Sequence, residues 1–153
     1  MRTLLTASKF AIVSLIALQA TSSVAEPTYE QWVAQGALLQ RAFHCAALAD
    51  YAQKYDEAQR LFNAALDIGR PLVEGVVAGR IKPRNDLWIV PLGLLGCFAG
   101  PNTEFILGRM WECSRESALM FIRQEKFDEQ REAAGREFDR ANCTFIAPPT
   151  MTK

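Results

Sequence analysis

The chain has 153 residues, half of them hydrophobic, and its 17 basic side chains balance 17 acidic ones. This length and apolar content suit a single domain with a buried core. Basic and acidic residues are interleaved, as in residues 123–126, so the clustered lysines and arginines that nucleic-acid binding requires are missing and we expect no nucleic-acid partner.

Residues 1–25 have the three-part pattern of a secretory signal peptide. Arg2 and Lys9 give a positive start, an apolar run follows over residues 10–18, and small residues precede the expected cleavage site after Ala25. The apolar run is about half as long as the roughly 17 to 25 residues of a membrane-spanning helix. We therefore expect cleavage, no membrane span afterwards, and a mature chain in the periplasm or outside the cell.

The cysteines all lie in the part of the chain that is expected to leave the cytoplasm: Cys45, Cys97, Cys113 and Cys143. An even number of cysteines in a short exported protein predicts disulfides, here two of them. Disulfide formation would also remove these residues as candidate metal ligands or nucleophiles.

Apolar residues recur at helical spacing along most of the chain, and no stretch alternates long enough to predict a sheet. A first helix is expected to start at Thr28, which forms a capping-box pattern with Gln31, and to run to about residue 53. Phe43 and Cys45 face nearly opposite sides of this helix. A helix that is apolar on both sides is typical of a central position in a bundle.

A second helix is expected over about residues 56–78. Its apolar stripe keeps its phase through Pro71, which favours one helix over two. Residues 86–99 form the most apolar stretch, and it is too short and too rich in glycine and proline to cross a bilayer. We interpret it as a third helix, buried and distorted.

Asn102 or Thr103 can cap a fourth helix, and a fifth is expected over about residues 128–141. Residues 147–153 are expected to form a frayed tail. Five helices joined by short turns predict a compact, mainly up-and-down all-α bundle, with one domain over residues 26–146.

Helix geometry favours one of the disulfide pairings. If the last two helices form an antiparallel hairpin, Cys113 lies within about one helical turn of Cys143. Cys45 then pairs with Cys97. The alternative joins Cys45 to Cys143 and Cys97 to Cys113. If the chain turns directly after the third helix, Cys97 and Cys113 lie roughly 13 Å apart along the helix axis, so this alternative is less favoured.

His44 is the only histidine, so sites that need several histidine ligands are excluded. We expect no metal and no cofactor, and a structural or surface role for His44. Glu112 and Glu116 lie one helical turn apart and could act as an acid-base pair. They share their face with Arg109 and Arg123, which is typical of a solvated surface, so an enzyme using this pair ranks third among our hypotheses.

Glycine precedes arginine at four places: residues 69–70, 79–80, 108–109 and 135–136. We interpret the glycines as sites of close helix approach or helix termination, and the arginines as side chains that extend to solvent. The alternative is that these arginines form a shared anion site.

Trp32 and Trp88, near helix starts, and Arg109 are candidates for an exposed interface, because tryptophan and arginine are frequent at interface hot spots. Trp111 is expected in the core. The chain has no catalytic motif, so we expect an exported, non-catalytic helical protein that binds another periplasmic or envelope protein as an inhibitor, immunity protein or accessory factor. The alternative is a small-ligand or cofactor-binding bundle with a pocket beside the third helix and Arg109.

Overall fold

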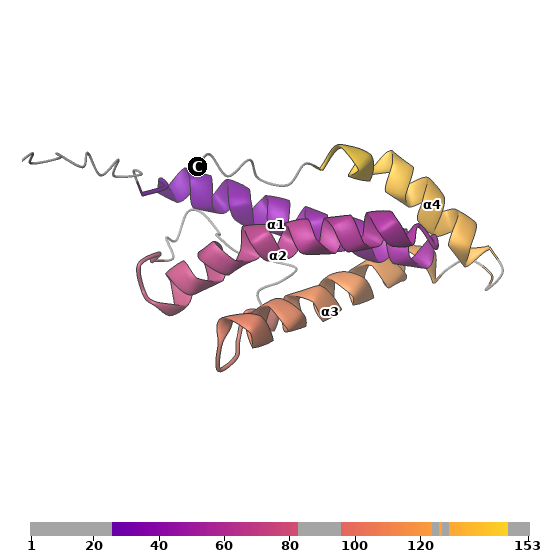
Figure 1. Cartoon of the computed structure of the whole chain (residues 1–153). Helices are drawn as coiled ribbons and strands as arrows, with labels where there is room; N and C mark the ends of the chain where they lie inside the picture. Colours follow the sequence, from indigo (N-terminus) through magenta and orange to yellow (C-terminus); the bar gives the residue numbers. More distant parts are fainter. Residues whose placement is uncertain (1–25, 83–95, 124–125, 127–128, 147–153) are drawn as a thin grey trace, which may run out of the picture.

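The computed structural model describes residues 26–82, 96–123, 126 and 129–146, which form an all-helical structure (Figure 1). Its elements in chain order are α1 (Tyr29–Tyr51), α2 (Tyr55–Val77), α3 (Thr103–Ile122), α4 (Gln130–Arg140) and the short 3₁₀ helix η2 (Cys143–Phe145). The prediction of an all-α protein is confirmed. The expected count of about five helices is slightly too high, because the described residues contain four α-helices.

Three of the predicted segments lie wholly or mostly outside the described residues. The expected third helix, at 86–99, falls there except for its end, and residues 96–99 are not α-helical. The signal peptide at 1–25 and the tail at 147–153 also lie outside the described part and stay predictions.

Local signals set the helix ends. The Thr28 hydroxyl accepts a hydrogen bond from the Gln31 amide at 3.3 Å, and the Gln31 side-chain oxygen accepts one from the Thr28 amide at 2.6 Å. This is the predicted capping box. Asn102 caps α3 by accepting from the Phe105 amide at 2.9 Å. Between α1 and α2, Gln53 has a left-handed φ of 60°, which helps the chain reverse its direction.

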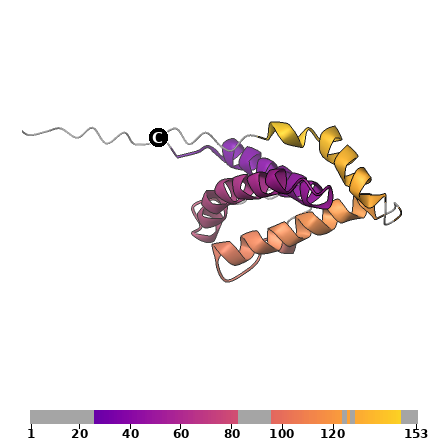
Figure 2. The same cartoon turned by 45° about the vertical axis from the view of Figure 1, so that its right-hand side comes forward.

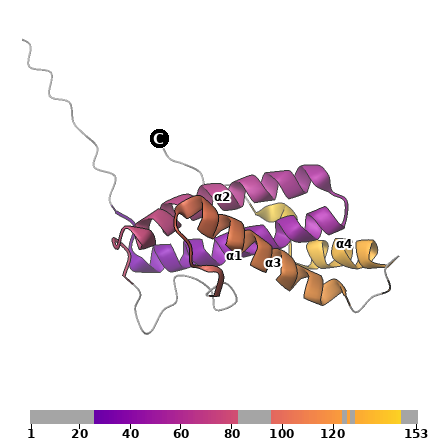
Figure 3. The same ribbon diagram turned by 90° about the horizontal axis from the view of Figure 1, so that it is seen from below.

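α1 lies at the centre of the bundle, as its two apolar sides predict. It contacts α2, α3 and α4 (Figures 2 and 3). Its side chains are buried on several faces in the C-terminal half, where residues 45–49 have no exposed surface. The shared core of the bundle therefore forms around α1.

α2 continues through Pro71 as one helix, which confirms the prediction from its apolar stripe. It is followed by Gly79, whose φ of 68° is a left-handed conformation that glycine adopts without strain. Ile81 then folds back against Gly75, where an added Cβ would lie 2.5 Å from Ile81 Cδ1. The absence of a side chain at Gly75 thus lets the buried Ile81 close this end of α2.

The two disulfides form, but the pairing that we favoured from the sequence is wrong. Cys45 pairs with Cys143, with their Cα atoms 5.5 Å apart. Cys97 pairs with Cys113, with a Cα separation of 6.5 Å. The less favoured alternative is therefore the one that the structure adopts.

The reason is the direction of α4. We assumed that α3 and α4 form an antiparallel hairpin, but α4 turns away from α3 and packs mainly on α1 (Figures 1 and 2). Cys143 consequently meets Cys45 on α1. The segment before α3 folds back on that helix, and Arg109 on α3 donates to the carbonyl oxygens of Gly96 and Ala99 at 3.2 and 3.3 Å. This return path brings Cys97 next to Cys113.

Basic side chains attach the C-terminal part of the domain to α1 and α2. Arg41 donates to the Ala141 carbonyl at 2.8 Å, and Arg60 donates to the Ile146 carbonyl at 2.6 Å. These contacts lie on either side of η2, whose Cys143 is fully buried. Two hydrogen bonds and a disulfide thus fix η2 against the first two helices.

The described residues contain no helix that is both long enough and apolar enough to span a bilayer. The two disulfides are consistent with a protein that is exported or secreted.

The four glycine–arginine steps have different surroundings. Gly69 lies where α2 meets α1 and α3, and an added Cβ would be 2.5 Å from Leu107 Cδ2 and 3.1 Å from Leu39 Cδ1. At Gly108 and Gly135 an added Cβ would meet nothing within 4 Å. The predicted close approach therefore applies to Gly69, and the predicted helix termination to Gly79.

Alanine substitutions at Gly69 and Gly135 are expected to differ in their effect on stability. Both replace a helical glycine and so gain about 1 kcal/mol of helix propensity. Only Gly69→Ala forces a methyl group against the buried side chains of Leu39 and Leu107, and overpacking of this kind costs about 1–3 kcal/mol. Urea unfolding should give Gly69→Ala a free energy of unfolding that is about 1–3 kcal/mol lower than that of Gly135→Ala. Equal stabilisation of both variants would contradict the close approach.

Candidate binding pocket

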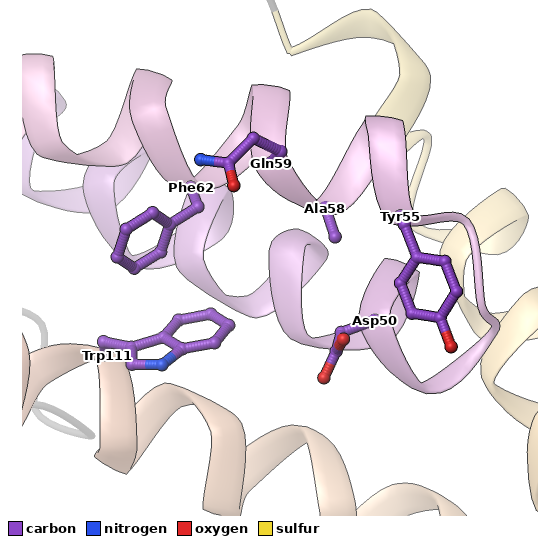
Figure 4. Close-up of a pocket in the computed structure, with 6 residues that line it drawn as sticks. All are labelled: Asp50, Tyr55, Ala58, Gln59, Phe62 and Trp111. Carbon is purple, nitrogen blue, oxygen red and sulfur yellow. The ribbon is translucent and has the colours of Figure 1, made fainter.

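A pocket of about 360 Å³ opens where α1, α2 and α3 meet (Figure 4). Its walls come from the end of α1, the first two turns of α2 and the middle of α3. The residues that line it are Asp50, Tyr55, Ala58, Gln59, Phe62 and Trp111. The volume is at the small end of the range for ligand sites, which suits one side chain or one small molecule.

The inner part of the pocket is aromatic. The Phe62 and Trp111 rings meet edge to face with centroids 5.1 Å apart. Behind them, the fully buried Phe43 has its ring centroid 5.9 Å from that of Phe62 and 5.8 Å from that of Trp111. Such tilted arrangements are the favoured geometry of aromatic pairs. The floor of the pocket is therefore continuous with the core of the bundle.

The outer part of the pocket is exposed and polar. Tyr55 is 63% exposed, although its side chain is large and apolar over most of its surface. Gln59 lies one helical turn further along α2, and its amide nitrogen donates to the Asn63 side-chain oxygen at 2.9 Å. In Figure 4 its oxygen is turned toward the pocket.

Asp50 is the acidic residue of the pocket. Among the described residues it forms no ion pair within 4.0 Å, although basic residues lie nearby in sequence. Lys54 instead pairs with Asp139 at 3.1 Å and lies 4.3 Å from the centre of the Phe138 ring. The last turn of α1 also carries no basic residue, so the negative end of the helix dipole adds to the Asp50 charge. Asp50 is the one charged residue among those that line the pocket.

The residues that the sequence singled out for an interface do not gather at this pocket. Trp32 is half-buried and packs against the core, and Trp88 lies outside the described residues. Arg109 is exposed and lies at a second hollow of about 430 Å³, whose other lining residues are Phe105, Gly108, Trp111, Glu112 and Cys113. Trp111, which we expected in the core, is half-buried. It packs against the core and also lines both hollows.

The carboxylates considered for acid-base work are exposed on α3. Glu112 lies 3.9 Å from Arg115, and Glu116 lines an open hollow with Ser117, Met120 and Arg123 among its residues. In the described part of the chain, no group of three histidine, cysteine, aspartate or glutamate residues could hold a metal ion.

The pocket residues Asp50, Tyr55 and Gln59 were not identified from the sequence. Tyr55, Gln59 and Phe62 lie at helical spacing on one face of α2. The apolar stripe of this helix extends to the exposed Tyr55 only if its aromatic ring is counted as apolar. Asp50 joins them because the chain reverses between α1 and α2, and this reversal depends on the conformation at Gln53.

His44 on α1 is half-buried where this helix packs against α4. Burial lowers the pKa of its imidazole below the ordinary value near 6.5. Glu137 on α4 acts in the opposite direction, since its negative charge favours the protonated ring. The pKa of Glu137 is itself lowered, first by its hydrogen bond with Arg140. The folded state thus prefers a neutral His44 and an ionised Glu137.

Stability is expected to fall as the pH drops below about 6.5, because the unfolded chain then binds a proton at His44 before the folded chain does. The contribution of Glu137 has the same sign and is lost at lower pH, as the pH falls through its own lowered pKa. Urea unfolding between pH 7 and 5.5 should show the decrease in the native protein and a flatter profile in His44→Gln. Glu137→Gln should make the decrease in stability steeper, because the charge that favours the protonated imidazole is lost. Parallel profiles for His44→Gln and the native protein would contradict the assignment.

No family model matches the chain, and no curated protein or solved structure is significantly similar to it. The candidate site therefore depends on the residues and geometry described above.

Proposed function

We propose that this chain is an exported, non-catalytic protein that binds a partner protein of the cell envelope, as an inhibitor, immunity protein or accessory factor. The observation that carries the proposal is the solvent-open aromatic pocket bordered by the exposed Tyr55. Tyrosine and tryptophan are enriched at the energetic centres of protein interfaces, where they fill or form pockets.

The framework around the pocket also supports a binding role. Its floor continues into the core through Phe43, and Cys45, two residues further along α1, joins Cys143 in a disulfide. A pocket on such a framework loses little conformational freedom when a partner binds, which favours affinity. The disulfides themselves suit an oxidising compartment such as the periplasm.

The proposal can be tested by site-specific photo-crosslinking of the full chain in its source organism. A benzophenone amino acid at Tyr55 is expected to give a specific adduct with one envelope protein. The same group at Arg131, an exposed position on α4, serves as the matched control. The proposal fails if Tyr55 gives no adduct, or if the adducts from both positions are the same.

A second candidate function is the binding of a small ligand in the hollow beside Arg109. The observation that favours it is that Arg109, Phe105 and Trp111 line this hollow of about 430 Å³ together with Glu112, which offers both charges and two aromatic rings to a small ligand. Native mass spectrometry of the purified mature protein should then detect a bound compound that is lost in Arg109→Gln. A mass equal to that of the bare chain would count against this function.

A further inference from the structure

We infer that the pocket formed by Asp50, Tyr55, Gln59, Phe62 and Trp111 recognises a lysine or arginine side chain of the partner protein. This inference rests on the proposed function and names the chemistry that the partner must present. It follows from the charge of the pocket, the orientation of its acceptors and the nature of its walls.

The one charged residue that lines the pocket is acidic. Asp50 has no ion pair among the described residues, and its carboxylate lies at the negative end of the α1 dipole. The basic residues nearby have other partners. Lys54 pairs with Asp139, and Arg60 pairs with Glu57 at 2.7 Å. Arg115 on α3 lies over the Tyr51 ring, beside Asp50, and its guanidinium is 3.9 Å from the Glu112 carboxylate. A cation entering the pocket would therefore meet a carboxylate that has no ion pair among the described residues, and this contact would favour a cation over an anion.

Two polar side chains of the pocket, Asp50 and Gln59, present acceptor oxygens. Asp50 offers its carboxylate oxygens, and the Gln59 amide nitrogen donates to Asn63 while its side-chain oxygen is turned toward the pocket (Figure 4). Ammonium and guanidinium groups carry several donors and no acceptor. The two acceptors thus complement a basic side chain, and charge-assisted hydrogen bonds to the carboxylate would be the strong contacts.

The walls suit the rest of such a side chain. Lysine and arginine have apolar stems that pack along hydrophobic surface while the charged end stays polar. Ala58, Phe62 and Trp111 offer that surface, and the faces of Trp111 and Tyr55 can attract a cation through their ring electrons. The pocket thus combines an apolar wall for the stem with acceptors for the charged group.

The test is an NMR titration of the mature, oxidised protein with capped amino acids. N-acetyl-lysine and N-acetyl-arginine methylamides are the probes, and the norleucine and glutamate derivatives are the uncharged and anionic controls. Saturable shifts are expected at the Trp111 indole and at the amides of Tyr55 and Gln59 with the basic probes, and none with the glutamate derivative. Norleucine should bind at least tenfold more weakly, because it retains the stem and lacks the charge. Equal binding of norleucine, or no shifts with the basic probes, would overturn the inference.

Two variants with the same change in charge extend the test. Asp50→Asn should weaken binding of the basic probes about tenfold, whereas Glu116→Gln, which removes a carboxylate outside the pocket, should not change it. Thermal unfolding checks that both variants fold, and an unchanged affinity in folded Asp50→Asn would overturn the inference. The titration judges the pocket chemistry and the crosslinking at Tyr55 judges the partner, so the two proposals can fail separately.

Discussion

Replacement of both Cys45 and Cys143 by alanine is expected to lower the free energy of unfolding by about 4–5 kcal/mol. The two cysteines are 98 residues apart in the sequence, so their disulfide closes a long loop and strongly restricts the unfolded chain. Both are also fully buried in the native state. A loss of this size is a large share of the 5–15 kcal/mol that typically stabilises a folded domain.

The second disulfide provides a matched control. Cys97 and Cys113 are 16 residues apart, and removal of such a short loop costs about 3 kcal/mol in the same chain-entropy description. Urea unfolding of the two double-alanine variants, followed by far-UV circular dichroism, should rank the Cys45 and Cys143 variant as the less stable. The reverse order, or equal losses, would contradict the expected dominance of loop length. Peptide mapping of the non-reduced native protein should yield the fragments joined by each pair.

Helix positions could be predicted from the sequence because the signals that set them are local. The Thr28 and Gln31 capping box, the Asn102 cap and the stripe through Pro71 each involve residues within a few turns of one another. The disulfide pairing depends on the path of α4, which packing against α1 decides. Nothing in the spacing of Cys113 and Cys143 distinguishes a hairpin from a helix that turns away.

The candidate pocket could not be predicted from the sequence because of a related ambiguity. Phe62 and Trp111 have the helical phase of core residues, and each does contact the buried Phe43. Each also has a second side that faces the pocket, and periodicity does not separate a fully buried residue from one at the edge of the core. The sequence indicates only that Asp50 and Tyr55 are solvated residues beside a turn. The reversal of the chain at Gln53 brings both of them to the same hollow.

Replacement of Phe43 by alanine is expected to destabilise the protein by about 3–5 kcal/mol. The ring has no exposed surface and contacts Phe62 on α2 and Trp111 on α3, so its removal leaves a cavity at the junction of these helices with α1. Chemical unfolding measures the loss, and an unchanged dependence on urea concentration would indicate that the surface exposed on unfolding is the same.

Two further variants make this prediction specific to the cavity. Phe43→Leu keeps most of the volume and should cost less than about 1.5 kcal/mol, while Tyr55→Ala, at an exposed ring on the other side of the pocket, should change stability by about 0.5 kcal/mol or less. A loss below about 1 kcal/mol in Phe43→Ala would contradict the buried aromatic cluster.

Because Phe43 supports the rings of the pocket from behind, Phe43→Leu should also weaken the binding of N-acetyl-arginine methylamide, even though residue 43 does not line the pocket. Tyr55→Ala would weaken the same binding with almost no loss of stability, and the two variants together would separate the framework of the pocket from its contact surface.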